Sequence, residues 1–222
     1  FGKSLFLSML TAYYDINKRE RFDDLFEELD IASHPTEGQG KYQVLFFDFS
    51  RVGSRIDSLE KDFDDYCSIV VDSFASYYAT FYAPEFFENV KNKAGFKAKL
   101  NYINEEAKKR NYPLYLIVDE YDNFTNTVLN EEGEGVYHAL THADGFYRET
   151  FKLFKGMFSR ILMMGVSPVT MDDLTSGFNI AEAITMNPRF NMMLGFSETE
   201  VREMIRYYQS VGQIQADEEE LI

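Results

Sequence analysis

Apolar and polar positions alternate in blocks along the chain, and the spacing within each block distinguishes helices from strands. Nearly continuous apolar runs, as expected for strands covered on both faces, occur at residues 44–49, 114–118 and 161–166. Helical spacing predicts helices over residues 3–14, 22–29, 57–82, 96–110, 146–158 and 198–210. Helices and strands therefore alternate, which predicts an α/β fold built around a layered sheet.

Local signals refine these limits. The long helix over residues 57–82 carries one apolar stripe at steps of three or four: Leu59, Phe63, Tyr66, Val70, Phe74, Tyr77 and Phe81. Ser197 and Glu200 form a capping-box pattern at the start of the last helix. The stretch 123–135 is rich in Asn, Glu and Gly, which predicts a loop.

The chain begins Phe1-Gly2-Lys3-Ser4, and Gly-Lys-Ser is the end of the G-x-x-x-x-G-K-[ST] phosphate-binding loop. In a complete loop, backbone N–H groups surround the phosphates, the lysine reaches the β- and γ-phosphates, and the hydroxyl ligates Mg²⁺. Gly2, Lys3 and Ser4 would take these roles, with the N-terminus of the following helix directed at the same anion. The alternative is an ordinary helix start with Ser4 near its N-cap. The strand and turn that precede such a loop are expected upstream.

The strand 114–118 runs directly into Asp119-Glu120. A hydrophobic strand that delivers two acids is the second element of many phosphate-loop NTPases, and open α/β sheets bind ligands at the carboxyl ends of their strands. Asp119 would hold Mg²⁺ through water, and Glu120 would orient or deprotonate the attacking water. The alternative is a strand that simply ends in solvated acids. The spacing of about 115 residues from Gly-Lys-Ser favours the nucleotide site.

Other polar residues near strand ends are weaker candidates. Ser167 follows the strand 161–166 and would offer a hydroxyl to the γ-phosphate or the water; equally, it ends a strand before Pro168. Asp122 would help to position the metal or cap the loop that follows it. Asp48 lies near another strand end. It would contact the ligands of the metal without binding the metal itself, or it would simply be solvated there.

Four blocks in order carry a family resemblance: FGKSLFLSML, LIVDEYDNF, MMGVSPVTMDDLTSGFNIAEAI and LGFSETEV. They resemble the AAA-ATPase-like domain family over nearly the whole chain, and the runs DEYD (119–122) and SGFN (176–179) are the more specific parts. The resemblance implies a three-layer P-loop NTPase-like sheet flanked by helices, with the first strand missing from this chain. It also implies ATP and Mg²⁺ as ligands, with Lys3 and Ser4 at phosphate and metal and with Asp119 and Glu120 at metal and water.

The same resemblance implies a domain organisation. Residues 1–195 are expected to form an N-terminally truncated NTPase-like core, and residues 196–222 to begin a helical lid or a following domain. In longer members of the family, the ATPase-like domain is often followed by a PD-(D/E)XK-type nuclease-like domain. ATP binding and hydrolysis are therefore expected to be coupled to an attached domain of that kind or to a separate protein partner.

The composition of the chain limits its expected binding partners and its expected compartment. Apolar residues make up 45% of the 222 residues and aromatic residues 16%, which is enough for a sizeable core. The formal charge of −15 opposes direct nucleic-acid binding, whose affinity comes mainly from Lys and Arg contacts to phosphate. The single Cys67 excludes an intrachain disulfide and fits a reducing compartment, so we expect a cytoplasmic protein. No apolar run approaches the roughly 20 residues that span a membrane.

The leading functional hypothesis is an ATPase in which Lys3 and Mg²⁺ stabilise charge on the γ-phosphate and Glu120 directs in-line attack by water. The alternative is a nucleotide-responsive interaction module with little or no hydrolysis, which would change shape on binding ATP. A P-loop kinase is a third possibility, although an adjacent Asp-Glu pair suits water activation better.

Overall fold

The computed structural model describes residues 2–53, 55–141, 145–166, 182–191 and 193–212. The chain divides into two compact units. The larger one is Leu7–Ala181, and the smaller one combines Phe1–Phe6 with Glu182–Ile222. The prediction of a core over residues 1–195 and a separate segment over 196–222 stays a prediction.

The described residues of the larger unit form a parallel sheet of three strands, β1 (Gln43–Asp48), β2 (Leu114–Asp119) and β3 (Arg160–Met163), in the order β1-β2-β3. The register pairs Asp48 with Asp119 across β1 and β2, and Val118 with Met163 across β2 and β3. All three strands therefore end at one edge of the sheet. The predicted α/β class is confirmed, and β1 and β2 are largely buried as predicted. The prediction of a buried strand over residues 161–166 is wrong in part, because β3 is exposed or half-buried and ends at Met163.

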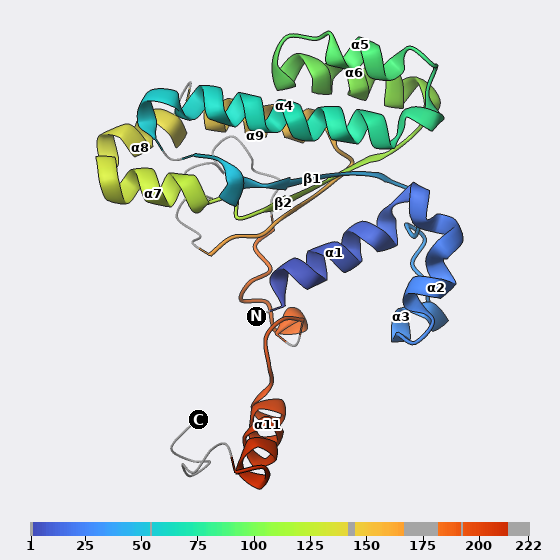
Figure 1. The fold of residues 1–222 in the computed structure, drawn as a ribbon, viewed down its shortest axis with the longest axis vertical. Coiled ribbons are helices and arrows are strands. Elements are labelled where there is room, and N and C mark those ends of the chain that lie inside the picture. The colour runs from blue at the N-terminus through green and yellow to red at the C-terminus, as the bar shows by residue number, and fades with distance from the viewer. Residues whose placement is uncertain (1, 54, 142–144, 167–181, 192, 213–222) are drawn as a thin grey trace. The chain divides into compact units, whose positions relative to one another are not determined.

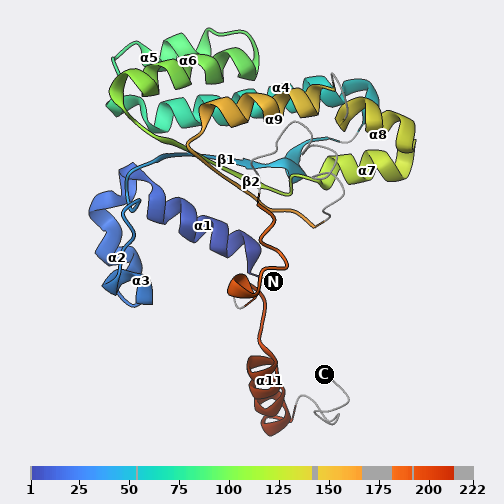
Figure 2. The same cartoon turned by 180° about the vertical axis from the view of Figure 1, so that it is seen from behind.

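Helices cover both faces of this sheet. Helices α4 (Leu59–Tyr77), α6 (Gly95–Arg110) and α9 (Phe146–Met157) lie over one face, and the Leu7–Tyr14 part of α1 (Lys3–Tyr14) lies on the other (Figures 1 and 2). Because successive strand residues point to opposite faces, alternate positions belong to the two layers. A hydrophobic core joins the sheet to α4, α6 and α9 through Leu45, Phe47, Leu116, Val118, Phe63, Leu100 and Phe154.

Shorter elements connect these layers. They are the helices α2 (Phe22–Phe26), α3 (Asp30–Ser33), α5 (Phe86–Lys91), α7 (Asn123–Glu132) and α8 (Glu134–Thr141), and the 3-10 turns Ile16–Arg21, Phe49–Arg51, Ile56–Ser58 and Ala79–Phe81. The prediction of a loop over residues 123–135 is wrong, because α7 and α8 occupy this stretch. Val128 of α7 and Tyr137 and Leu140 of α8 are buried, so packing outweighs the weak local helical signal.

The long helix α4 differs from its prediction in length and in the face that it buries. It ends at Tyr77 instead of Tyr82, and its fully buried line includes Cys67 and Val71. Tyr77 from the predicted stripe is 49% exposed. Cys67 is a packed thiol, as expected for a small apolar side chain on this helix, and burial raises its pKa well above the ordinary value.

Tyrosine hydroxyls occupy the outer edge of β1. The hydroxyl of Tyr78 accepts the Val44 N–H at 2.9 Å, and that of Tyr66 accepts the Asp48 N–H at 2.9 Å. Tyr78 in turn donates to the buried carboxylate of Asp15 at 2.8 Å, and Tyr77 donates to the same carboxylate at 2.7 Å. These bonds tie the end of α1 to the end of α4 and occupy two backbone N–H groups on the outer edge of β1.

Several of these phenols predict a loss of stability in alkali. Burial raises the pKa of Tyr115 and of Tyr82 from 10.0 to about 12, and it also raises the pKa of Tyr78. A group whose pKa is higher in the folded state contributes its full share of folding stability below its unfolded pKa. That contribution is lost as pH rises from the unfolded pKa through the folded pKa. Above pH 10, each buried phenol such as Tyr115 therefore lowers the free energy of unfolding by up to about 1.4 kcal/mol per pH unit.

This prediction is checked by measuring urea unfolding between pH 8 and pH 12 beside the ultraviolet absorbance of phenolate. We expect flat stability to about pH 10, a steep fall above it, and phenolate absorbance that rises together with unfolding. Tyr115→Phe should make the fall shallower. A protein whose tyrosines all titrate near pH 10 while it remains folded would contradict the prediction.

The smaller unit contains α11 (Glu198–Ser210) and the 3-10 turn Pro188–Phe190. The predicted capping box is confirmed: the Ser197 hydroxyl accepts the Glu200 N–H at 3.2 Å, and the Glu200 carboxylate accepts the Ser197 N–H at 2.7 Å. Across the residues that the structure describes, no helix combines the length and apolar character needed to cross a bilayer.

Candidate functional site

Asp119 and Glu120 lie where the middle strand of the sheet ends. Asp119 is the last residue of β2 and is only 6% exposed, and the polypeptide leaves the sheet at Glu120. The Asp119 carboxylate accepts the backbone N–H of Glu120 at 3.0 Å. The two acids therefore stand at the carboxyl edge of a parallel sheet, the edge at which open α/β sheets commonly bind ligands.

Glu120 has an unusual backbone conformation. Its φ of 51° lies in the left-handed region, which a residue with a Cβ enters at a cost of roughly 1–2 kcal/mol. Such strain persists only where the surrounding structure enforces it, and it gathers at functional sites. The backbone therefore changes direction directly after Asp119, where the strand gives way to a bend and a turn. Sequence reasoning singles out the acids but contains no signal for this turn.

The strain makes a prediction about stability. Glu120→Gly is expected to raise the free energy of unfolding by about 1 kcal/mol, because glycine adopts positive φ without a Cβ penalty. Urea unfolding measures the change. Glu105→Gly, at an exposed position inside α6, is the matched control and should lose about 1 kcal/mol. A Glu120→Gly protein less stable than its parent would show that the glutamate contributes more than its backbone costs.

Buried groups hold the turn after Glu120. The Tyr121 N–H donates to the Met164 carbonyl at 3.3 Å, and the hydroxyl of Tyr147 on α9 donates to the Tyr121 carbonyl. Tyr147 is fully buried, and burial raises its pKa well above the ordinary value, so it remains a neutral donor. The sequence marks Tyr147 only as an apolar position of a helix, and nothing in the pattern indicates its bond to the acidic turn.

Asp48 stands beside Asp119 in the register but is engaged elsewhere. Its carboxylate accepts the Ser50 hydroxyl at 2.6 Å and the Arg51 Nε–H at 3.2 Å, which caps the turn after β1. Of the two roles predicted for Asp48, the structure thus favours the end of a strand over support of a metal. Within the described ranges, no group of three or more His, Cys, Asp or Glu side chains is arranged to hold a metal ion by itself.

Gly2, Lys3 and Ser4 lie at the start of α1. Gly2 has a φ of 84°, a conformation that glycine adopts freely, and its carbonyl accepts the Phe6 N–H at 2.9 Å to begin the helix. Lys3 is half-buried and Ser4 is exposed. These residues belong to the smaller unit, and Asp119 and Glu120 belong to the larger one. Their meeting in one site stays a prediction, and Ser167 lies outside the described residues.

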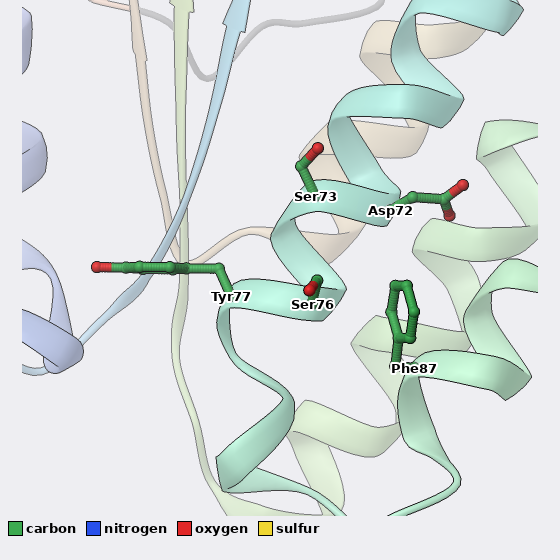
Figure 3. Close-up of a pocket in the computed structure, with 5 residues that line it drawn as sticks. All are labelled: Asp72, Ser73, Ser76, Tyr77 and Phe87. Carbon is green, nitrogen blue, oxygen red and sulfur yellow. The ribbon is translucent and has the colours of Figure 1, made fainter.

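Two surface pockets lie on the helical layer. One, of about 440 Å³, adjoins the C-terminal half of α4 (Figure 3) and is lined by Asp72, Ser73, Ser76, Tyr77 and Phe87. The side chains of Phe87 and Asp72 lie on one side of α4, whereas the Tyr77 ring extends to the other side of this helix (Figure 3). The other, of about 680 Å³, has an acidic rim over Phe63 and Phe96. Neither is lined by a predicted site residue.

A protein-family model described as predicted AAA-ATPase matches residues 1–175. The chain belongs to this AAA-ATPase-like family. The matched range includes Gly2, Lys3, Ser4, Asp119, Glu120 and Ser167 and ends before α11. Searches of curated proteins and of solved structures gave no match to the chain. For a member of the AAA-ATPase-like family, the three-stranded parallel sheet flanked by helices is compatible with a P-loop-like fold, and nucleotide binding is the activity that the family name suggests.

Proposed function

We propose that this domain binds ATP and hydrolyses it with Mg²⁺, and that hydrolysis acts on an attached domain or on a protein partner. The observation that carries the proposal is the strained Glu120 directly after the buried Asp119, at the carboxyl edge of the sheet in an AAA-ATPase-like chain. A carboxylate held in a costly conformation at this edge suits the orientation of a water for in-line attack.

Each predicted residue has a distinct role in this proposal. Lys3 and the backbone of Gly2 would bind the phosphates, with Ser167 near the γ-phosphate or the water. Glu120 would orient the water and accept its proton. Asp119 and Ser4 would hold Mg²⁺, whose preference for a few oxygen ligands together with phosphate and water fits a carboxylate and a hydroxyl. When bound, the ion supplies positive charge that stabilises the transferred phosphoryl group.

We also propose that a further parallel strand, the first of the fold, pairs with the outer edge of β3. In the described part of the chain β3 is paired on one side only, and its apolar residues Ile161, Leu162 and Met163 are half-buried. Tyr78 and Tyr66 occupy the opposite edge of the sheet, so β3 is the edge left for extension.

The direction of α1 is consistent with this proposal. Tyr14, at the end of α1, packs on Tyr115 with ring centroids 5.1 Å apart, near the amino end of β2. Helix α1 therefore ends near the amino ends of the strands, as is usual for the helix that follows a phosphate loop.

The proposal is tested with the full-length natural polypeptide by titration with ATP and Mg²⁺ and by release of inorganic phosphate. We expect saturable binding and turnover that both require Mg²⁺. Binding without turnover would favour the nucleotide-responsive interaction module instead. Transfer of the phosphoryl group to a small molecule would favour a kinase, and a polypeptide that binds no nucleotide would overturn all three functions.

A further inference from the structure

Asp122 forms a buried link between the two strand ends that border the proposed site. It lies three residues after Asp119 and is only 1% exposed. Its two carboxylate oxygens accept the N–H of Val166 at 3.2 and 3.1 Å, and one of them also accepts the side-chain N–H of Asn126 at 2.9 Å. The carboxylate thus joins the turn after β2 to the segment after β3 and to the first turns of α7.

Backbone contacts reinforce the same link. The Met164 N–H donates to the Val118 carbonyl at 2.8 Å, and the Tyr121 N–H donates to the Met164 carbonyl. Between these bonds and Val166, the backbone of Gly165 passes so close to the turn that a Cβ there would lie 2.4 Å from the Asp122 carboxylate and 2.6 Å from the Tyr121 ring. Glycine is required for this approach.

We propose that Asp122 is a positioning residue of the nucleotide site, which fixes the strained turn at Glu120 in relation to the segment that leads into Ser167. This inference rests on the proposed ATPase function. Asp122 is buried and would act through the backbone rather than by touching the nucleotide. A left-handed turn persists only if its neighbours hold it, and the Asp122 carboxylate, two residues further on, is a buried anchor for that turn.

A carboxylate suits this position better than an amide. Among the described residues, the Val166 backbone and the Asn126 side chain both donate to Asp122. A carboxylate has acceptor sites for both, whereas an asparagine side chain has one acceptor oxygen and would turn its NH₂ group toward one of the donors. Asp122→Asn therefore leaves one acceptor oxygen in place of two with almost no change in volume, and it keeps the contact with Asn126 only if the Asn126 amide turns to present its oxygen to the new NH₂ group.

The test compares Asp122→Asn with its parent in the full-length natural polypeptide. We expect kcat for ATP hydrolysis to fall at least about 10-fold while KM changes less than about 3-fold, because the interaction acts on the geometry of the attack rather than on binding. The Val166 amide should exchange its hydrogen at least about 10-fold faster. The double variant Asp122→Asn with Asn126→Asp restores a donor–acceptor pair and should recover most of kcat.

Asp72→Asn is the matched control, because it weakens another carboxylate contact, that of Asp72 with the buried Lys99 at 2.7 Å between α4 and α6. It should lower the melting temperature and leave kcat and the exchange of Val166 unchanged. An active parent with unchanged kcat and Val166 exchange in Asp122→Asn overturns this inference alone. A parent that neither binds nor hydrolyses ATP overturns the proposed function, and in that case faster exchange in Asp122→Asn would assign the link to folding only.

Discussion

Glu120→Gln is expected to lower kcat for ATP hydrolysis by about 100- to 1,000-fold while leaving ATP affinity within a few-fold of the parent, because a positioned general base contributes roughly 10²–10⁴-fold. Glutamine keeps the size of the side chain and its position in the left-handed turn, so the change removes proton acceptance and charge but little else. Phosphate release under saturating ATP and Mg²⁺ measures kcat, and equilibrium titration measures binding.

The control for this experiment is Asp48→Asn, which removes one negative charge from the same edge of the sheet. The Asp48 carboxylate is held by Ser50 and Arg51, so we expect its loss to change kcat by less than about 3-fold. An equal fall in both variants would assign the effect to the net charge of the edge. Hydrolysis by Glu120→Gln at the rate of the parent would contradict the proposed role of Glu120.

Gly165→Ala is expected to lower the free energy of unfolding by about 2–3 kcal/mol, at the upper end of the cost of forcing atoms into a packed region. The new Cβ would lie 2.4 Å from the Asp122 carboxylate and 2.6 Å from the Tyr121 ring. Both neighbours are buried, so the backbone after β3 would have to move away from the acidic turn. Urea unfolding followed by circular dichroism measures the loss.

Gly156→Ala is the control for Gly165→Ala, because it adds the same methyl group at an uncrowded position. Gly156 lies within α9, and no atom lies within 4 Å of the site where its Cβ would be built. Alanine there should raise the free energy of unfolding by about 0.5–1 kcal/mol, because it restricts the unfolded chain and suits a helix. If Gly165→Ala were as stable as the parent, the close approach between the two strand ends would be wrong.

The sequence predicts those elements whose apolar pattern is strong and whose ends carry a local signal. Helices α1, α6, α9 and α11 begin and end within a residue or two of their predicted limits. The stretch 123–135 is predicted to be a loop, although α7 and the start of α8 occupy it, because buried side chains such as Val128 become informative only when the folded chain packs around them. The long helix α4 stops early because Tyr78 turns to bond Asp15, a residue 63 positions away.

For the candidate site, the sequence indicates the residue types but not the conformation that holds them. Asp119 and Glu120 are recognisable because they follow an apolar strand. The left-handed turn at Glu120 and the bond from Val166 to Asp122 depend on how β3 lies beside β2, which is a contact between residues 44 positions apart. Local patterns contain no information about such a register, so these features emerge only in the folded chain.

The contrast between the two edges of the sheet also bears on how the protein behaves at high concentration. Backbone groups at an open strand edge are templates for pairing with another molecule, above all beside apolar side chains. The hydroxyls of Tyr78 and Tyr66 already occupy N–H groups of β1, whereas among the described residues β3 shows no strand on its outer side. Aggregation of any preparation that leaves this edge uncovered should therefore start at Ile161–Met163, and a charged residue placed there would slow it.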